Sequence, residues 1–102
     1  MPIIHVVLSK LNGQQPETHL DAIRATAQGM VGKIPGLKRC DVGPPLESTK
    51  WRAQGWDLML FAELDDEKAL EVYATHPEHE KYKAQTGPYN VDVMAFDIES
   101  SV

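Results

Sequence analysis

The sequence is poor in cysteine, in basic residues and in long apolar runs. Cys40 is the only cysteine, so no disulfide forms within the chain, and no second Cys or His lies near it at metal spacing. We expect a buried, passive thiol there. No run approaches the roughly 20 apolar residues of a membrane span. Residues 1–10 lack the basic start and the cleavage site of a signal peptide, so we expect a cytosolic protein without a membrane partner.

Basic residues are also few relative to acidic ones. Ten Lys and Arg stand against fifteen Asp and Glu, which gives a formal net charge of −5. Phosphate binding needs clustered basic residues, and the longest basic run here is Lys38-Arg39, so the composition argues against nucleic acid. With 102 residues, 42% hydrophobic and 25% charged, the chain has the length and composition of one globular domain, residues 1–102.

Hydrophobic periodicity predicts four strands and three helices. β-Branched or alternating apolar segments predict the strands, at 3–9, 37–42, 56–64 and 91–99. Apolar residues at spacings of three and four predict an amphipathic helix that starts near Pro16 and reaches Ile34. An Asp cap starts a second helix over 65–76, and Pro77 starts a third over 77–86. The polar segment 43–55 is expected to be a loop.

This order of elements predicts a ferredoxin-like α+β fold, with a four-stranded antiparallel sheet and helices on one face. The third strand is apolar on both sides, with Leu58 and Leu60 on one and Met59 and Phe61 on the other. A sheet that is apolar on both faces needs a second partner. The simplest partner is another copy of the same chain, so we expect a homodimer through sheet-to-sheet packing.

The stretch VYATHPEH, residues 72–79, places one tyrosine and two histidines close together. With Pro77 at the first helical position, His79 falls in the first turn, where the helix dipole disfavours an imidazolium. A neutral imidazole can accept a proton. The alternative is a polar residue at a helix start with no chemistry. Tyr73 is either core packing or a hydroxyl donor to a developing oxyanion.

For the other histidines, the sequence context mostly indicates structural roles. His76 precedes Pro77 and is expected to be a helix N-cap or a hinge. A metal site at His76 and His79 would need further ligands, and neither an H-E-x-x-H motif nor a cysteine pair exists, so no metal is predicted. His19 is expected to be solvated at a helix start. His5, within an apolar strand, is either a satisfied core residue or part of a pocket.

Pro2 offers a further alternative. Removal of Met1 would leave an N-terminal proline amine, which could act as the base of a tautomerase-like enzyme if its pKa fell. The order of elements fits such enzymes poorly.

Four segments of the chain form a recognisable set, namely IIHVVLSKL (3–11), IPGL (34–37), GWDLMLFAELDDEKALEVYATHPEH (55–79) and DVMAFDIE (92–99). The most distinctive string within them is Y-x-x-H-P-x-H. Through these segments, and over nearly its whole length, the chain resembles the stress-responsive A/B barrel (Dabb) domain family. The resemblance implies a dimeric α+β barrel. Members of the family include stress proteins of unclear activity and a polyketide cyclase that catalyses an intramolecular aldol condensation without a cofactor.

The resemblance also implies roles for individual residues. Tyr73 matches the proton donor of that cyclase, His79 matches its base, and His5 matches a histidine that lines the pocket. Leu58 stands where the cyclase has a further pocket histidine, which argues against an identical substrate. Because related barrels carry out other reactions, the type of reaction does not follow from the fold.

The expected function is a cofactor-free cyclase or lyase-type enzyme for a polyketide-like, partly apolar substrate that binds between the sheet and the helices. The expected apolar wall of its pocket consists of Leu20, Ile23, Met30, Leu58, Leu60 and Phe96. The alternative is a non-catalytic dimer that binds a small ligand. An enzyme needs a pocket on which Tyr73 and His79 converge. A structural module needs His79 bonded to backbone with no free space beside it.

Overall fold

The computed structural model describes all of residues 1–102. Its elements follow the expected order. They are β1 (Ile3–Leu11), α1 (His19–Gly29), β2 (Leu37–Gly43), the 3₁₀ helix η1 (Glu47–Ala53), β3 (Leu58–Leu64), α2 (Glu67–Thr75), α3 (Pro77–Thr86), the 3₁₀ turn η2 (Gly87–Tyr89) and β4 (Asn90–Glu99). None of the helices is long and apolar enough to cross a membrane.

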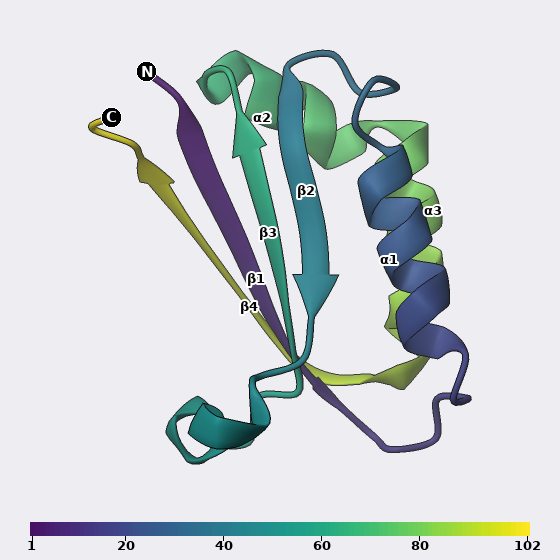
Figure 1. The fold of residues 1–102 in the computed structure, drawn as a ribbon. Helices are drawn as coiled ribbons and strands as arrows, with labels where there is room; N and C mark the ends of the chain where they lie inside the picture. Colours follow the sequence, from purple (N-terminus) through teal and green to yellow (C-terminus); the bar gives the residue numbers. More distant parts are fainter.

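The four strands form one antiparallel sheet in the order β2-β3-β1-β4. The three α-helices lie together against one face of this sheet, and the other face is open (Figure 1). This arrangement confirms the predicted ferredoxin-like α+β fold. The segment 43–55 is not wholly irregular, because η1 occupies its centre.

The first helix is shorter than the hydrophobic spacing predicts. It ends at Gly29, and Gly32 has a φ of +91°, a left-handed conformation that does not continue a helix. Met30 and Ile34 are nevertheless buried. Their spacing therefore reflects packing against the core rather than membership of one continuous helix.

Fifteen buried residues form the hydrophobic core between the sheet and the helices. β3 contributes Leu58, Leu60, Ala62 and Leu64 on the face expected from the sequence. Cys40 is buried among them, and burial together with the charge of Asp41 raises the pKa of its thiol to about 12. The thiol is therefore protonated and passive at neutral pH.

Gly36 joins the layer of helices to the start of β2. Its φ is +82°, and a Cβ built on it would lie 2.5 Å from the Cβ of Ala69 in α2. Its carbonyl also accepts a hydrogen bond from the amide of Asp65, just before α2. A side chain at this position would therefore be strained by the backbone and blocked by α2.

The sequence His76-Pro77 separates α2 from α3. His76 has a ψ of 139°, an extended conformation of the kind favoured before proline, and its Nδ1 accepts the amide hydrogen of Glu78 at 3.1 Å. His76 is therefore the N-cap of α3, as predicted. At the start of α2, Asp66 is the predicted aspartate cap and accepts from the amide of Ala69 at 2.8 Å.

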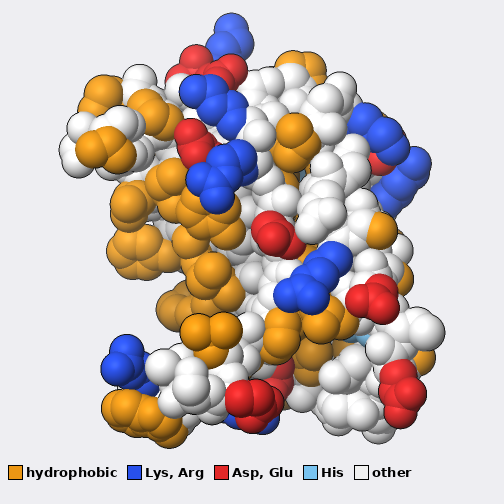
Figure 2. Space-filling view, in the orientation of Figure 1, with side chains coloured by type: hydrophobic (Ala, Val, Ile, Leu, Met, Phe, Trp, Pro, Cys, Tyr) orange, Lys and Arg blue, Asp and Glu red, His pale blue; other side chains and the backbone are white.

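The open face of the sheet carries large apolar side chains that this chain does not cover. Met59 on β3 and Met94, Phe96 and Ile98 on β4 are all exposed. Hydrophobic side chains gather along this side of the molecule in the space-filling view (Figure 2). An exposed apolar patch of this kind marks an interaction surface.

Candidate active site

A pocket of about 390 Å³ lies between the sheet and the pair of helices α2 and α3. It is lined by His5, Val7, Ser9, Val42, Leu58, Leu60, Tyr73, His79, Tyr82, Lys83, Thr86, Gly87, Asn90, Val93 and Ala95. A volume of a few hundred Å³ is that of a small-molecule site.

The three residues that the sequence marks as catalytic meet at this pocket. The rings of Tyr73 and His79 are stacked, with centroids 4.2 Å apart and planes at 27°. The ring of His5 meets Tyr73 edge to face, with centroids 5.3 Å apart. The break at His76-Pro77 makes the stacking possible, since residues six apart on one continuous helix would point in different directions.

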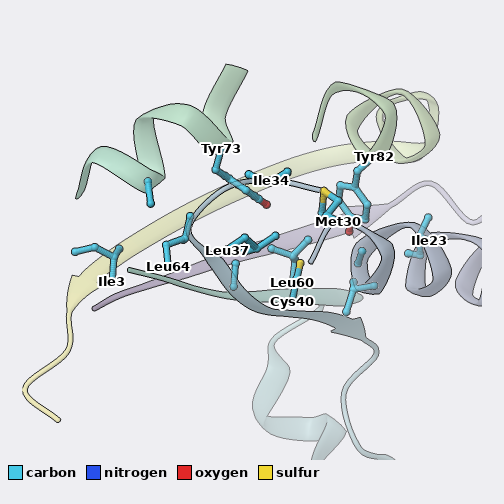
Figure 3. Close-up of a cluster of buried hydrophobic side chains, with 14 of the residues drawn as sticks. Ile3, Ile23, Met30, Ile34, Leu37, Cys40, Leu60, Leu64, Tyr73 and Tyr82 are labelled. Carbon is cyan, nitrogen blue, oxygen red and sulfur yellow. The ribbon is translucent and has the colours of Figure 1, made fainter. Parts of the chain in front are cut away.

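Tyr73 is 1% exposed, and its hydroxyl is buried without a hydrogen-bond partner. The side chain reaches from α2 toward the sheet (Figure 3). Burial raises the pKa of Tyr73 well above its ordinary value. Smaller contributions in the same direction come from the nearby Cys40, Tyr82 and Asp97. The hydroxyl therefore keeps its proton at neutral pH, and no acceptor within the chain receives a hydrogen bond from it.

His79 has the opposite tendency. Burial lowers its pKa below the 6.5 of a solvated histidine, although the bond to Ala74 and the charge of Glu80 oppose the shift. Its Nδ1 donates to the carbonyl of Ala74 at 3.4 Å, which leaves Nε2 with a free lone pair. The neutral ring expected from the sequence is thus favoured, but mainly by burial rather than by the helix dipole.

Asp97 is a site residue that the sequence reasoning missed. Its carboxylate accepts a hydrogen bond from Nδ1 of His5. The register of β1 and β4 places His5 directly opposite Asp97. An acidic residue within an apolar strand was the signal available in the sequence, but only the pairing of the strands identifies its partner.

Some of the residues expected in the apolar wall line the pocket and others lie elsewhere. Leu58 and Leu60 line the pocket. Ile23 and Met30 are buried in the core and do not line it, and Leu20 also lies outside it. Phe96 lies outside the pocket, because it pairs with Val6 in the sheet and is 65% exposed on the open face. Val93 and Ala95 line the pocket in its place.

His19 also differs from the expectation of a solvated side chain. It is 7% exposed, its Nε2 donates to the carbonyl of Gln85 at 3.3 Å, and its ring meets Tyr89 edge to face. His19 therefore ties the start of α1 to the end of α3. No group of three or more potential metal ligands occurs in the structure.

The helix α3 and the start of β4 supply further lining residues that the sequence reasoning did not single out. They are Tyr82, Lys83, Thr86 and Asn90. Lys83 forms an ion pair with Glu80 at 2.9 Å. Thr86 is buried, and its hydroxyl donates toward the carbonyls of Tyr82 and Lys83.

Residues 3–100 match the family model described as the Stress responsive A/B Barrel Domain. No curated protein matches the sequence significantly.

Solved structures of similar fold cover almost the whole chain. A dimeric ferredoxin-like protein of unknown function from Thermobifida fusca is 25% identical, with a TM-score of 0.82, over 98% of this chain and 92% of that one. A dimeric protein of unknown function from Bacteroides fragilis is 22% identical, with a TM-score of 0.81, over 97% and 96%. A hydroxynitrile lyase from Passiflora edulis is 14% identical, with a TM-score of 0.82, over 99% and 95%.

Proposed function

The chain belongs to the stress-responsive A/B barrel domain family, and we propose that it is a homodimeric, cofactor-free enzyme that forms a carbon–carbon bond within a polyketide-like substrate. The observation that carries the proposal is the stacked pair of Tyr73 and His79 at the wall of a pocket. The pKa of Tyr73 is raised and that of His79 is lowered. One ring therefore holds a proton to donate while the other has a lone pair to accept one.

In this proposal Nε2 of His79 removes a proton from a carbon beside a carbonyl group of the substrate. The hydroxyl of Tyr73 donates a hydrogen bond to that carbonyl oxygen as it gains negative charge. The resulting enolate carbon attacks a second carbonyl of the same molecule, and a new carbon–carbon bond forms. The proton held by His79 then passes to the new alkoxide, so the ring returns to its neutral state.

His5 is proposed to orient the substrate. Because its Nδ1 donates to Asp97, its Nε2 carries the free lone pair and accepts from a hydroxyl or enol of the substrate. Its edge contact with Tyr73 keeps the two polar groups within the same end of the pocket. The apolar side chains along the rest of the pocket suit the hydrocarbon part of the substrate.

A lyase among proteins of the same fold is consistent with carbon–carbon chemistry, but at 14% identity the likeness concerns the fold alone. The choice of reaction therefore rests on the site of this chain.

The alternative is a dimer that binds a small ligand without converting it. His79 does bond to backbone, at a donor–acceptor distance of 3.4 Å, as that alternative requires. Both functions need the pocket, so the pocket does not separate them. The enzyme is favoured by the stacked Tyr73 and His79, whose pKa values are shifted in opposite directions as a proton donor and a proton acceptor require.

The test uses a linear aliphatic triketone as the substrate, with cyclised product followed by chromatography. We expect His79→Gln to lower kcat/KM by about 10²–10⁴-fold, which is the usual contribution of a general base. Tyr73→Phe should lower it by about 10²–10³-fold, as for loss of an oxyanion donor.

Lys81→Gln is the matched control, since Lys81 is exposed on the same helix and does not line the pocket. Full turnover by a folded His79→Gln protein would exclude the proposed base. Binding of the triketone without turnover by the unmodified protein would favour the binding dimer instead.

A further inference from the structure

The pocket is elongated and has a second polar end. Along β1 its lining runs from His5 to Ser9, about 13 Å at the rise of a strand. Along α3 it runs from His79 to Thr86, about 10 Å at the rise of a helix. Ser9, Thr86 and Asn90 form this second end, which we call the distal polar end.

The distal polar end lies away from His5, Tyr73 and His79, the residues proposed for catalysis. Asn90 begins β4, next to Leu11 in the register, whereas Asp97 lies opposite His5 further along the same strand. Along the sheet, the segment between the two ends is apolar, with Val7, Leu60 and Ala95, while Val93 lies opposite Ser9 at the distal polar end. A ligand that fills the pocket is therefore polar at both ends and apolar in the middle.

Two oxygen atoms of the distal polar end, Oδ1 of Asn90 and Oγ1 of Thr86, have lone pairs available as hydrogen-bond acceptors. Oδ1 of Asn90 is buried and has no partner. The hydroxyl hydrogen of Thr86 is directed to helix carbonyls at 3.4 Å, so only the lone pairs of its oxygen remain available. A buried acceptor without a partner is costly, and a ligand that donates to it removes that cost.

The charge near this end favours a neutral donor over an ammonium group. Lys83 is the only Lys or Arg that lines the pocket, and it lies three residues before Thr86 on the same helix. Residues three apart on a helix lie on the same face, so the two side chains are neighbours. An amine on the ligand would meet the positive charge of Lys83, whereas a hydroxyl would not.

We propose that the distal polar end binds a hydroxyl group of the substrate, about 10 Å from the carbonyl that Tyr73 polarises. The substrate class is then an elongated carbonyl compound with an apolar middle and a hydroxyl at its far end. The orientation rests on the proposed function, because Tyr73 and His79 fix which end carries the carbonyl. The affinity for a distal hydroxyl does not depend on turnover.

The experiment compares two medium-chain methyl ketones that differ only in a terminal hydroxyl placed about 10 Å from the carbonyl. Their dissociation constants are measured by calorimetry with the full-length protein. We expect the hydroxylated ketone to bind about tenfold more tightly, as for one hydrogen bond to a buried acceptor. Asn90→Leu and Thr86→Val should each reduce that preference to less than about threefold.

Thr26→Val is the matched control, because Thr26 makes the same hydroxyl-to-carbonyl bond, at 3.2 Å, on α1 outside the pocket. It should keep the full preference. Equal affinity of the unmodified protein for the two ketones, or no binding of either, would overturn the proposal. So would a preference that persists in both pocket variants.

His79→Gln separates this inference from the proposed function. A variant that keeps both turnover and the hydroxyl preference would refute the role of His79 as base and leave the distal polar end intact. Loss of turnover with the preference retained supports both.

Discussion

Tyr73 and His79 owe their protonation states to the same burial, which acts in opposite directions on a phenol and an imidazole. Burial disfavours the charged form of each, so tyrosine keeps its proton and histidine loses one. Their stacked rings shield each other from solvent. These are the protonation states that the proposed acid–base chemistry needs at neutral pH.

The lowered pKa of His79 predicts the pH dependence of activity. The acid limb of kcat/KM should have its midpoint below 6.5, because His79 stays neutral down to that pH. Titration of the His79 ring followed by NMR should give the same midpoint. Tyr73→Phe serves as the comparison, and its acid limb should persist because His79 remains. A midpoint above 6.5 in both measurements would contradict the assignment.

The same shift affects stability. Below pH 6.5 an unfolded chain protonates His79 more readily than the folded protein does, so the unfolded state binds more protons. The contribution of His79 to the free energy of unfolding should therefore fall as the pH drops from 6.5 toward the folded pKa. Below the folded pKa it should become constant.

The sequence was sufficient for some of these residues and not for others. Pro77 fixes the start of α3, so the cap at His76 and the first-turn position of His79 were predictable. The positions of Asp97 and Phe96 were not predictable. Alternation along β4 defines two faces but does not indicate which face packs against the helices. The register with β1 decides it, by placing Asp97 opposite His5.

The start of β2 requires a residue without a side chain at Gly36. We expect Gly36→Ala to lower the free energy of unfolding by about 2–4 kcal/mol, from the positive φ and the contact with Ala69 together. Urea denaturation measures the loss.

Gly13→Ala provides the comparison, since Gly13 has a φ of +79° with open space around it. It should cost only the backbone strain, about 1–2 kcal/mol. Equal losses for the two variants would show that the close approach of α2 contributes nothing.

Most elements follow from local patterns, whereas their ends depend on tertiary contacts. Leu58 and Leu60 were expected on the helix side of β3, and the aspartate cap predicted the start of α2. The sequence did not predict that α1 ends at Gly29, because Met30 and Ile34 are also buried in the core. Their spacing along the chain is the same as in a helix, although a turn places them there. His19 was misplaced because its partners, Gln85 and Tyr89, are distant in sequence.

The open sheet face predicts the oligomeric state. The proteins of this fold from Bacteroides fragilis and Thermobifida fusca are described as dimeric, and the apolar side chains of this face lack a cover within the chain. We expect the unmodified protein to sediment as a dimer. Phe96→Glu should raise the dissociation constant of that dimer by at least about a hundredfold, since two-fold symmetry buries the new charge twice. Analytical ultracentrifugation measures this change.

Val72→Glu is the control, because Val72 is an exposed apolar residue on α2, away from the sheet. It should leave the dimer intact. A Phe96→Glu protein that dimerises as tightly as the unmodified one would exclude packing through this face.

Alternate residues of β4 point to opposite faces of the sheet and contact different surroundings. Val93 and Ala95 line the pocket, and Asp97 holds His5, while Met94, Phe96 and Ile98 point to the open face. A partner that packs on the second set restrains the same backbone that positions the first. Where that restraint favours the ligand-binding geometry, association and ligand binding are thermodynamically linked, and each strengthens the other by the same factor. Dilution would then weaken ligand binding by mass action, although β4 stays paired with β1 within the chain.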